Sequence, residues 1–307
     1  MITMPGHSFS GILSQLSIEE REISQHLNKH VHTLAEKIGE RNLWHYKELT
    51  AAATYIDTTL LELGYTVSQH EFRVNGKTVT NIEVERTGST LPDEIVIVGA
   101  HYDSVIGSPG ADDNATGVAA VLELARLLAN TTFTRTIRFV SFVNEEPPFF
   151  QTDDMGSVVY ARRAHSRNEN IVAMLAIETI GYYSDAKGSQ HYPVPFSLFY
   201  PNTGDFIAFV GNIDSQGLVH RTVASFRSHT NFPSEGIAVP GWITGIGWSD
   251  HWAFWKNGYQ ALMITDTAPF RYPYYHTAED TPNNIDYDRT ARVVSGIARV
   301  IAELATL

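Results

Sequence analysis

The sequence predicts an α/β fold with a mostly parallel central sheet and helices on both of its faces. Three apolar runs, around 94–100, 136–143 and 172–177, are typical of strands buried on both faces of a sheet. Segments with helical spacing of apolar residues alternate with these runs, which favours parallel strands joined by helices. Each run is followed directly by histidine or acidic residues, and parallel strands would bring these residues to one crevice.

The chain before the first buried strand predicts two helices and a hairpin. Apolar spacing over about 17–38 indicates an amphipathic helix, and a serine followed three residues later by glutamate gives it a capping-box start. A second helix is expected over about 44–63, before a glycine. Strands around 66–74 and 79–85 flank Asn75-Gly76, which is a strong hairpin signal. We expect this hairpin to form one edge of the sheet.

The remaining elements follow in alternation. Asn114 is expected to cap the helix that comes after the first buried strand. The segment 182–203 is rich in Pro, Tyr and Ser, and we expect it to form a loop near the carboxyl ends of the strands. Further helices are predicted over about 115–129, 153–166, 215–228, 249–255 and 287–304, and further strands over about 206–210 and 261–265.

Composition limits the class of protein. The chain has 307 residues and no low-complexity linker, so one domain over 1–307 is expected, with the N-terminal helices, about 17–64, packed on the sheet. Its 34 acidic and 22 basic residues give a formal charge of -12, which disfavours nucleic acid and anionic membranes as partners. Because there is no cysteine, a zinc site has to use histidine and carboxylate ligands.

No apolar run has the length of a membrane span, and the opening residues lack the pattern of a signal peptide. A soluble protein is therefore expected, either cytoplasmic or exported with its leader absent from this sequence. The sequence does not determine the oligomeric state.

The stretch from His101 to Gly117 is the strongest functional signal. It places one histidine and three aspartates between a buried strand and an apolar helix. Taken singly, each such residue has an ordinary explanation: Asp112 and Asp113 could cap a helix, and Glu145-Glu146 could form a solvated turn. Their coincidence at several strand ends favours a metal site over these separate explanations.

The residue types suit two neighbouring divalent ions. A carboxylate can bridge two ions, and histidines with further carboxylates then complete each site. We assign Asp113 as the bridge and Glu145 as the general base that takes a proton from the activated water. The remaining ligands are assigned as His101 and Glu178 for one ion and Glu146 and His276 for the other.

Six motifs, in order, resemble metallopeptidase family 28, the co-catalytic zinc aminopeptidases related to glutamate carboxypeptidase II. They are HYDS, PGADDNATG, NEE, the acid after the strand 172–177, SDHWAFWKNGYQALM and YHTAEDT, and they span roughly 95–285. The resemblance implies the zinc aminopeptidase fold and two zinc ions held by the five ligands assigned above. It also implies that Glu145 is the general base and that Asp103 fixes the tautomer of His101.

Three features depart from the family pattern. Glu178 stands where the best-known aminopeptidases have the shorter aspartate, so the geometry of that ion is in doubt. Pro147-Pro148-Phe149-Phe150 replaces a commoner glycine-containing sequence. Trp248 stands near the SDH motif, where the aminopeptidases place a tyrosine, and we expect Tyr275 to be the oxyanion donor in its place, as in the carboxypeptidase relatives.

The expected function is a zinc-dependent exopeptidase, most plainly an aminopeptidase acting on peptide substrates. Two alternatives stay open: a mononuclear zinc enzyme resembling glutaminyl cyclase, and a non-catalytic binding domain of the same fold. Aromatic residues close in sequence to the site residues favour apolar or aromatic N-terminal residues as substrates, unless they only pack the core. These residues are Phe149, Phe150, Trp242, Trp248, Trp252, Phe270 and Tyr274.

Overall fold

The sheet has eight strands in the order β1-β2-β4-β3-β5-β8-β6-β7 in the computed structural model, which describes residues 3–306. Its four central strands are parallel to one another, as predicted. The hairpin β1-β2 forms one edge, and β6 and β7 form the other, with β6 antiparallel to β8. The strands are β1 (Ser68–Val74), β2 (Lys77–Arg86), β3 (Leu91–His101), β4 (Arg135–Phe142), β5 (Asn170–Glu178), β6 (Ile207–Gly211), β7 (Ser234–Ala238) and β8 (Ala261–Thr265).

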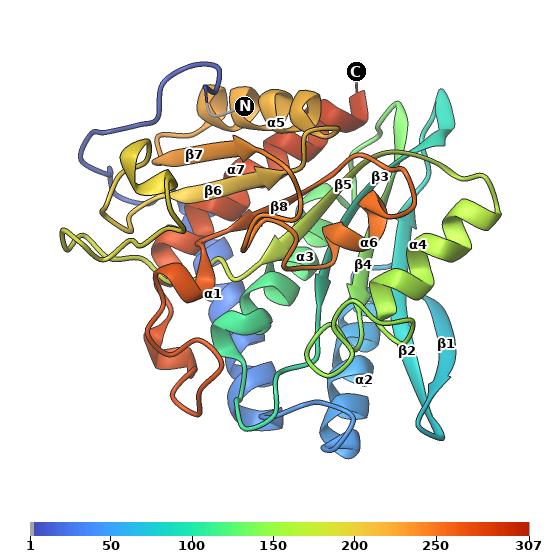
Figure 1. The fold of residues 1–307 in the computed structure, drawn as a ribbon. Helices are drawn as coiled ribbons and strands as arrows, with labels where there is room; N and C mark the ends of the chain where they lie inside the picture. Colours follow the sequence, from blue (N-terminus) through green and yellow to red (C-terminus); the bar gives the residue numbers. More distant parts are fainter. Residues whose placement is uncertain (1–2, 307) are drawn as a thin grey trace.

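Helices cover both faces of this sheet (Figure 1). On one face, α1, α2, α3, α5 and α7 bury their apolar residues in a large core shared with the strands. On the other face, α4 and α6 pack over a smaller core. The helices are α1 (Ile18–Val31), α2 (Tyr46–Glu62), α3 (Gly117–Leu128), α4 (Gly156–Ser166), α5 (Gln216–His229), α6 (His251–Trp255) and α7 (Tyr287–Thr306).

Local signals in the sequence produce the expected local structure. At the start of α1, the Ser17 hydroxyl accepts the Glu20 N–H at 3.1 Å, and the Glu20 carboxylate accepts the Ser17 N–H at 2.7 Å. Asn75 and Gly76 both have positive φ, 50° and 80°, as a two-residue hairpin turn requires. The capping box and the hairpin are therefore confirmed.

The strand β7 was not predicted. Its five residues, SEGIA, include a glycine and carry no clear alternation. The strand lies at the sheet edge, and the N-terminal arm packs against it: Met4 contacts Gly236, and the Ser8 hydroxyl accepts the Ser234 N–H at 2.9 Å. The strand is stabilised by these long-range contacts, which a local sequence pattern does not contain.

The order of the strands brings the predicted site together. β4, β3 and β5 are neighbours, so the residues that follow their carboxyl ends meet at one side of the molecule. Within residues 3–306, no helix is both long enough and apolar enough to cross a membrane.

Candidate metal centre

Two groups of side chains that share Asp113 lie beside the carboxyl ends of β3, β4 and β5. In the first group, His101 Nε2 lies 3.2 Å from Asp113 Oδ1 and 3.3 Å from Glu178 Oε2. In the second, His276 Nε2 lies 3.0 Å from Asp113 Oδ2 and 3.3 Å from Glu146 Oε2. The two oxygens of Asp113 face different groups, as a bridging carboxylate must.

The donor atoms in both groups fit divalent cations. His101 Nδ1 lies 3.2 Å from the main-chain oxygen of Asp103, and because a carbonyl only accepts, Nδ1 carries the proton and the Nε2 lone pair faces the carboxylates of its group. His101 Nε2, His276 Nε2 and Glu146 Oε1 are buried without a hydrogen-bond partner. Buried lone pairs that face carboxylates require a cation between them, and imidazole with carboxylate is a zinc ligand set.

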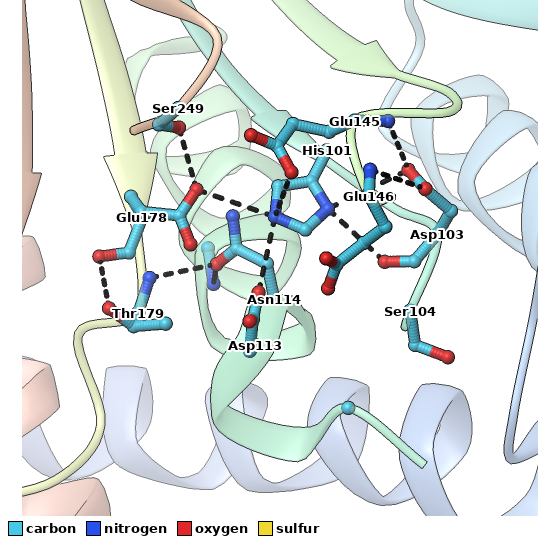
Figure 2. Close-up of polar contacts among 12 residues, drawn as sticks. His101, Asp103, Ser104, Asp113, Asn114, Glu145, Glu146, Glu178, Thr179 and Ser249 are labelled. Atoms are coloured by element: carbon cyan, nitrogen blue, oxygen red, sulfur yellow. Dashed lines mark hydrogen bonds and ion pairs between the residues drawn. The ribbon is translucent and has the colours of Figure 1, made fainter. Parts of the chain in front are cut away.

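Asp103 positions the glutamate pair (Figure 2). Its two carboxylate oxygens accept the N–H groups of Glu145 and Glu146, each at 3.1 Å. Asp103 Oδ1 is 3.6 Å from His101 Nδ1, whereas the main-chain oxygen of Asp103 is at 3.2 Å. The main-chain oxygen of Asp103 is therefore the nearer acceptor for His101 Nδ1, and the Asp103 carboxylate holds the turn after β4.

Glu145 lies next to the first group without belonging to it. Its Oε2 is 3.9 Å from His101 Nε2, and only 6% of the residue is exposed. Burial raises the pKa of Glu145 well above the ordinary carboxyl range; His101 opposes this shift, and Glu178 and Glu146 add to it. Glu145 is therefore a buried carboxyl group beside the candidate metal ligands.

The pKa values of the other candidate ligands are also shifted. Burial lowers the pKa of His276, but the carboxylates of Asp113 and Glu146, at 3.0 and 3.3 Å from its Nε2, outweigh burial and raise the value to about 10. Burial and the nearby Asp113 raise the pKa of Glu146 to about 7. For His101, burial is outweighed by Glu178 and Glu145, and its pKa lies well above the ordinary range. At neutral pH, protons therefore compete with metal ions for these ligands.

Two residues that the sequence did not assign hold ligand segments in place. The Asp280 carboxylate accepts the N–H groups of Asp112 at 2.8 Å and of Asp113 at 3.2 Å. Ser249 donates its hydroxyl to Glu178 Oε2 at 2.6 Å. Asp280 lies in the motif YHTAEDT and Ser249 in the motif SDH, both of which resemble the family. These motifs are the sequence signal from which both residues could have been predicted.

Asn114 does more than cap α3. Its Oδ1 accepts the Gly117 N–H at 3.0 Å, as predicted for a cap, and also the Thr179 N–H at 3.1 Å (Figure 2). Thr179 has φ 43°, Asn144 has φ 59° and His276 has φ 59°, so left-handed backbone occurs beside three of the ligand segments. Such conformations are costly for residues other than glycine and cluster at functional sites.

A cavity that is partly open to solvent adjoins the metal centre at Glu178. The loop 182–203 supplies part of its wall, as expected from its predicted position. Of the seven aromatic residues expected near the site, Trp248 and Phe270 line this cavity and the other five do not. Phe149, one of these five, is buried and stacks on Trp44 with ring centroids 5.8 Å apart.

Tyr275 lies between the cavity and the second metal group. It lines the cavity, and its ring stacks on His276 with centroids 3.9 Å apart. Burial raises the pKa of Tyr275 above its ordinary value, and the surrounding acids raise it further. Its hydroxyl therefore remains a hydrogen-bond donor at neutral pH.

At the ends of the parallel strands of this α/β sheet, two adjoining candidate metal sites of histidine and carboxylate side chains share one carboxylate, an arrangement that suits a pair of divalent ions. The sequence profile of Peptidase family M28 matches residues 81–301, and the chain belongs to that family. The resemblance drawn from the six motifs is thereby confirmed.

Two curated relatives differ in how much of their length is matched. The uncharacterized protein YfbL of Escherichia coli K12 is 37% identical over 286 residues, which cover 90% of this chain and 87% of YfbL. The probable aminopeptidase YDR415C of Saccharomyces cerevisiae is 26% identical over 241 residues, 74% of this chain and 57% of the yeast protein. The match thus spans just over half of the yeast protein.

Solved structures share the fold. The zinc aminopeptidase BSAP of Bacillus subtilis matches with a TM-score of 0.74 at 16% identity, over 92% of this chain and 95% of that chain. A glutaminyl cyclase of Fimbriiglobus ruber matches with a TM-score of 0.66 at 17% identity, over 96% of this chain and 97% of that chain. At these identities the likeness shows the fold, which is the predicted one, and leaves the reaction open.

Proposed function

We propose that the protein is a dinuclear zinc aminopeptidase. The observation that carries this proposal is the shared carboxylate: Asp113 turns one oxygen to His101 and the other to His276, and Glu145 lies beside them. Membership of a peptidase family implies peptide substrates. When bound, two zinc ions would lower the pKa of a water molecule and polarise the scissile carbonyl.

The chain's own residues would divide the remaining work. His101 and Glu178 would hold one ion and Glu146 and His276 the other, with Asp113 shared by both. Glu145 would accept the proton of the attacking water and pass it to the leaving amine. Tyr275 would donate its hydroxyl to the carbonyl oxygen as negative charge develops there.

The charges of the cavity favour a free amino end over a free carboxyl end. The lining includes no lysine or arginine; of its two carboxylates, Glu178 is a proposed zinc ligand and Glu235 lies 4.0 Å from Arg227. The carboxylate of a C-terminal residue would therefore find no cationic side chain in the lining to pair with it. This lack of a cation supports an aminopeptidase over a carboxypeptidase.

The floor of the cavity sets the size of the side chain that it takes. Glu178, Thr265, Ala208 and Glu235 are paired in one line across β5, β8, β6 and β7, and all four line the cavity. Three strand spacings correspond to roughly 14 Å. Phe196, Phe206, Ile246 and Met263 are among the other lining residues. A slot of this length and character suits a large apolar side chain of the N-terminal residue.

The test is a panel of aminoacyl arylamides, assayed with chelated protein before and after zinc is restored. An aminopeptidase should release the arylamine from Leu and Phe substrates only with metal, and should not cleave N-acetyl-Leu arylamide. Two zinc ions per chain, measured by elemental analysis, should accompany full activity. Ammonia release from a glutaminyl peptide with one ion per chain would instead indicate a cyclase, and zinc binding with no turnover of any substrate would indicate a binding domain.

A further inference from the structure

Arg41 is a fully buried cation beside the metal centre, and it lies outside the segment that matches the family profile. It belongs to the short connection between the N-terminal helices, which had no predicted role. Burial lowers the pKa of Arg41 to about 10, while Asp103, Asp280 and Asp113 oppose the shift. The side chain is therefore charged at neutral pH.

The guanidinium of Arg41 holds both ends of one loop. This loop, residues 102–110, joins His101 to the segment that carries Asp113, and we call it the ligand loop. At its start, Arg41 Nε donates to the Tyr102 carbonyl at 2.7 Å. At its end, Nη1 donates to Pro109 O at 2.5 Å and Nη2 to Gly110 O at 2.8 Å.

The middle of the ligand loop is held by the same connection. The Arg41 N–H donates to Ser104 Oγ at 3.1 Å, and the Ser104 N–H donates to the Arg41 carbonyl at 3.0 Å. Asn42 Nδ2 donates to the Ser104 carbonyl at 3.2 Å. The ligand loop is thus attached to residues 41 and 42 at its start, middle and end.

Gly110 shows how closely this attachment reaches the bridging ligand. Its φ is +61°, and a Cβ atom there would lie 2.4 Å from the Asp113 carbonyl and 3.3 Å from Arg41 Nη2. Glycine is needed for both the backbone conformation and the close approach. Arg41, Gly110 and Asp113 therefore pack against one another without space to shift independently.

We infer that Arg41 is a positioning residue of the metal centre, which sets the separation of His101 and Asp113 by binding both ends of the loop between them. This inference rests on the proposed metal centre and extends it to the N-terminal segment. Arginine suits this role because its planar group has five N–H donors in a fixed arrangement, which the single ammonium of lysine lacks. Because Asp113 is shared, the loss of Arg41 is expected to weaken both ions.

Electrostatics alone predicts the opposite change in metal affinity when Arg41 is replaced. A fixed positive charge beside a cation site repels the metal, so removing that charge alone would raise metal affinity. Loss of the hydrogen bonds that position the ligand loop would instead lower metal affinity. Changes to residues that orient metal ligands typically cost 10- to 100-fold in affinity. The direction of the change in affinity therefore distinguishes a positioning role from a role in charge balance.

The experiment is titration of chelated full-length protein with Co²⁺, followed by visible absorption, for wild type, Arg41→Met and Arg41→Lys. The matched control is Arg227→Met, because the Arg227 guanidinium also donates to main-chain carbonyls, those of Pro5, Gly6 and Ser234, but at the far edge of the sheet. Unfolding temperatures of all variants are measured without metal.

We expect Arg41→Met to bind both Co²⁺ ions at least tenfold more weakly, with altered absorption bands, and Arg41→Lys to show a loss in the same direction. The Arg227→Met control should lose thermal stability but keep Co²⁺ affinity within twofold of wild type. Unchanged or higher affinity in Arg41→Met would overturn the inference. If Arg41→Met does not fold, unchanged affinity in Arg41→Lys overturns it equally. Co²⁺ binding is measured without substrate, so the result does not depend on peptidase activity.

Discussion

Replacing Glu145 with glutamine separates proton transfer from metal binding. Glutamine has the same shape as glutamate, and the contacts that hold this position are made by main-chain N–H groups to Asp103, which the substitution leaves in place. The side chain lies 3.9 Å from His101 and is not in either metal group. We therefore expect Glu145→Gln to fold normally and to keep both metal ions.

The expected loss is in turnover. A positioned general base contributes about 10²–10⁴-fold, and the same residue is proposed to protonate the leaving amine, so the loss should reach at least this range. That corresponds to roughly 3–5 kcal/mol in activation free energy. Because the base acts in its ionised form, wild-type kcat/KM should fall with decreasing pH as Glu145 is protonated, and the variant should lack this part of the profile.

The assay compares kcat and KM on a Leu arylamide, with zinc content measured on the same samples. Glu94→Gln serves as the control, because Glu94 lies at the amino end of β3 and pairs with Arg135 at 2.5 Å, away from the metal centre. Activity of Glu145→Gln within about threefold of wild type, at equal zinc content, would remove Glu145 from the mechanism.

Three further predictions concern the ions and the cavity. Stepwise chelation should release two zinc ions in separate steps, the ion at His101 and Glu178 first, and Glu178→Ala should abolish that step only. The pKa values are about 10 for His276 and about 7 for Glu146, so zinc binding at pH 7 should release at least one proton. Zinc affinity should therefore rise with pH. Calorimetry in buffers of different ionisation enthalpy measures the proton release. Ala208→Phe should fill the cavity floor and reduce kcat/KM for Phe substrates more than tenfold while sparing Ala substrates, as a matched pair of assays would show.

Much of the site followed from the sequence because its ligands terminate strongly patterned elements. The segments 95–100 of β3 and 171–177 of β5 are apolar, and His101 and Glu178 are the last residues of these strands. A side chain at the carboxyl end of a buried parallel strand lies beside the carboxyl ends of the neighbouring strands. His276 followed from a motif alone, since it lies in an irregular loop with positive φ.

Other parts of the site left no local pattern. Arg41 contacts carbonyls that are 61 to 69 positions away, and its neighbours in sequence form neither a strand nor a regular helix. The cavity is formed by the loop 182–203 together with β6, β7 and β8, and β7 itself was missed. The second interaction of Asn114, with Thr179, depends on the position of β5 relative to α3. These features arise from tertiary contacts, for which periodicity gives no signal.

The acids of the site have two distinct tasks, and this division explains how ligands from separate segments are held together. Asp113, Glu146 and Glu178 present their carboxylates to the metal groups. Asp103 and Asp280 instead accept main-chain N–H groups of the ligand-bearing turns, two each. Because these bonds fix the backbone and leave the ligand side chains free, the geometry of the centre does not depend on the ligands contacting one another.

The two kinds of acid do not differ in how burial acts on them. Two accepted N–H groups favour the ionised form of a buried carboxylate, yet at Asp280 burial outweighs them and raises the pKa to about 6. Burial and the nearby Asp113 raise the pKa of Glu146, a candidate ligand, to about 7. Arg41 adds a fixed positive charge behind the ligand loop. All the hydrogen bonds of its guanidinium go to main-chain carbonyl oxygens. The cation that holds the backbone of the ligand loop, Arg41, is therefore separate from the two groups of side chains that would bind metal ions.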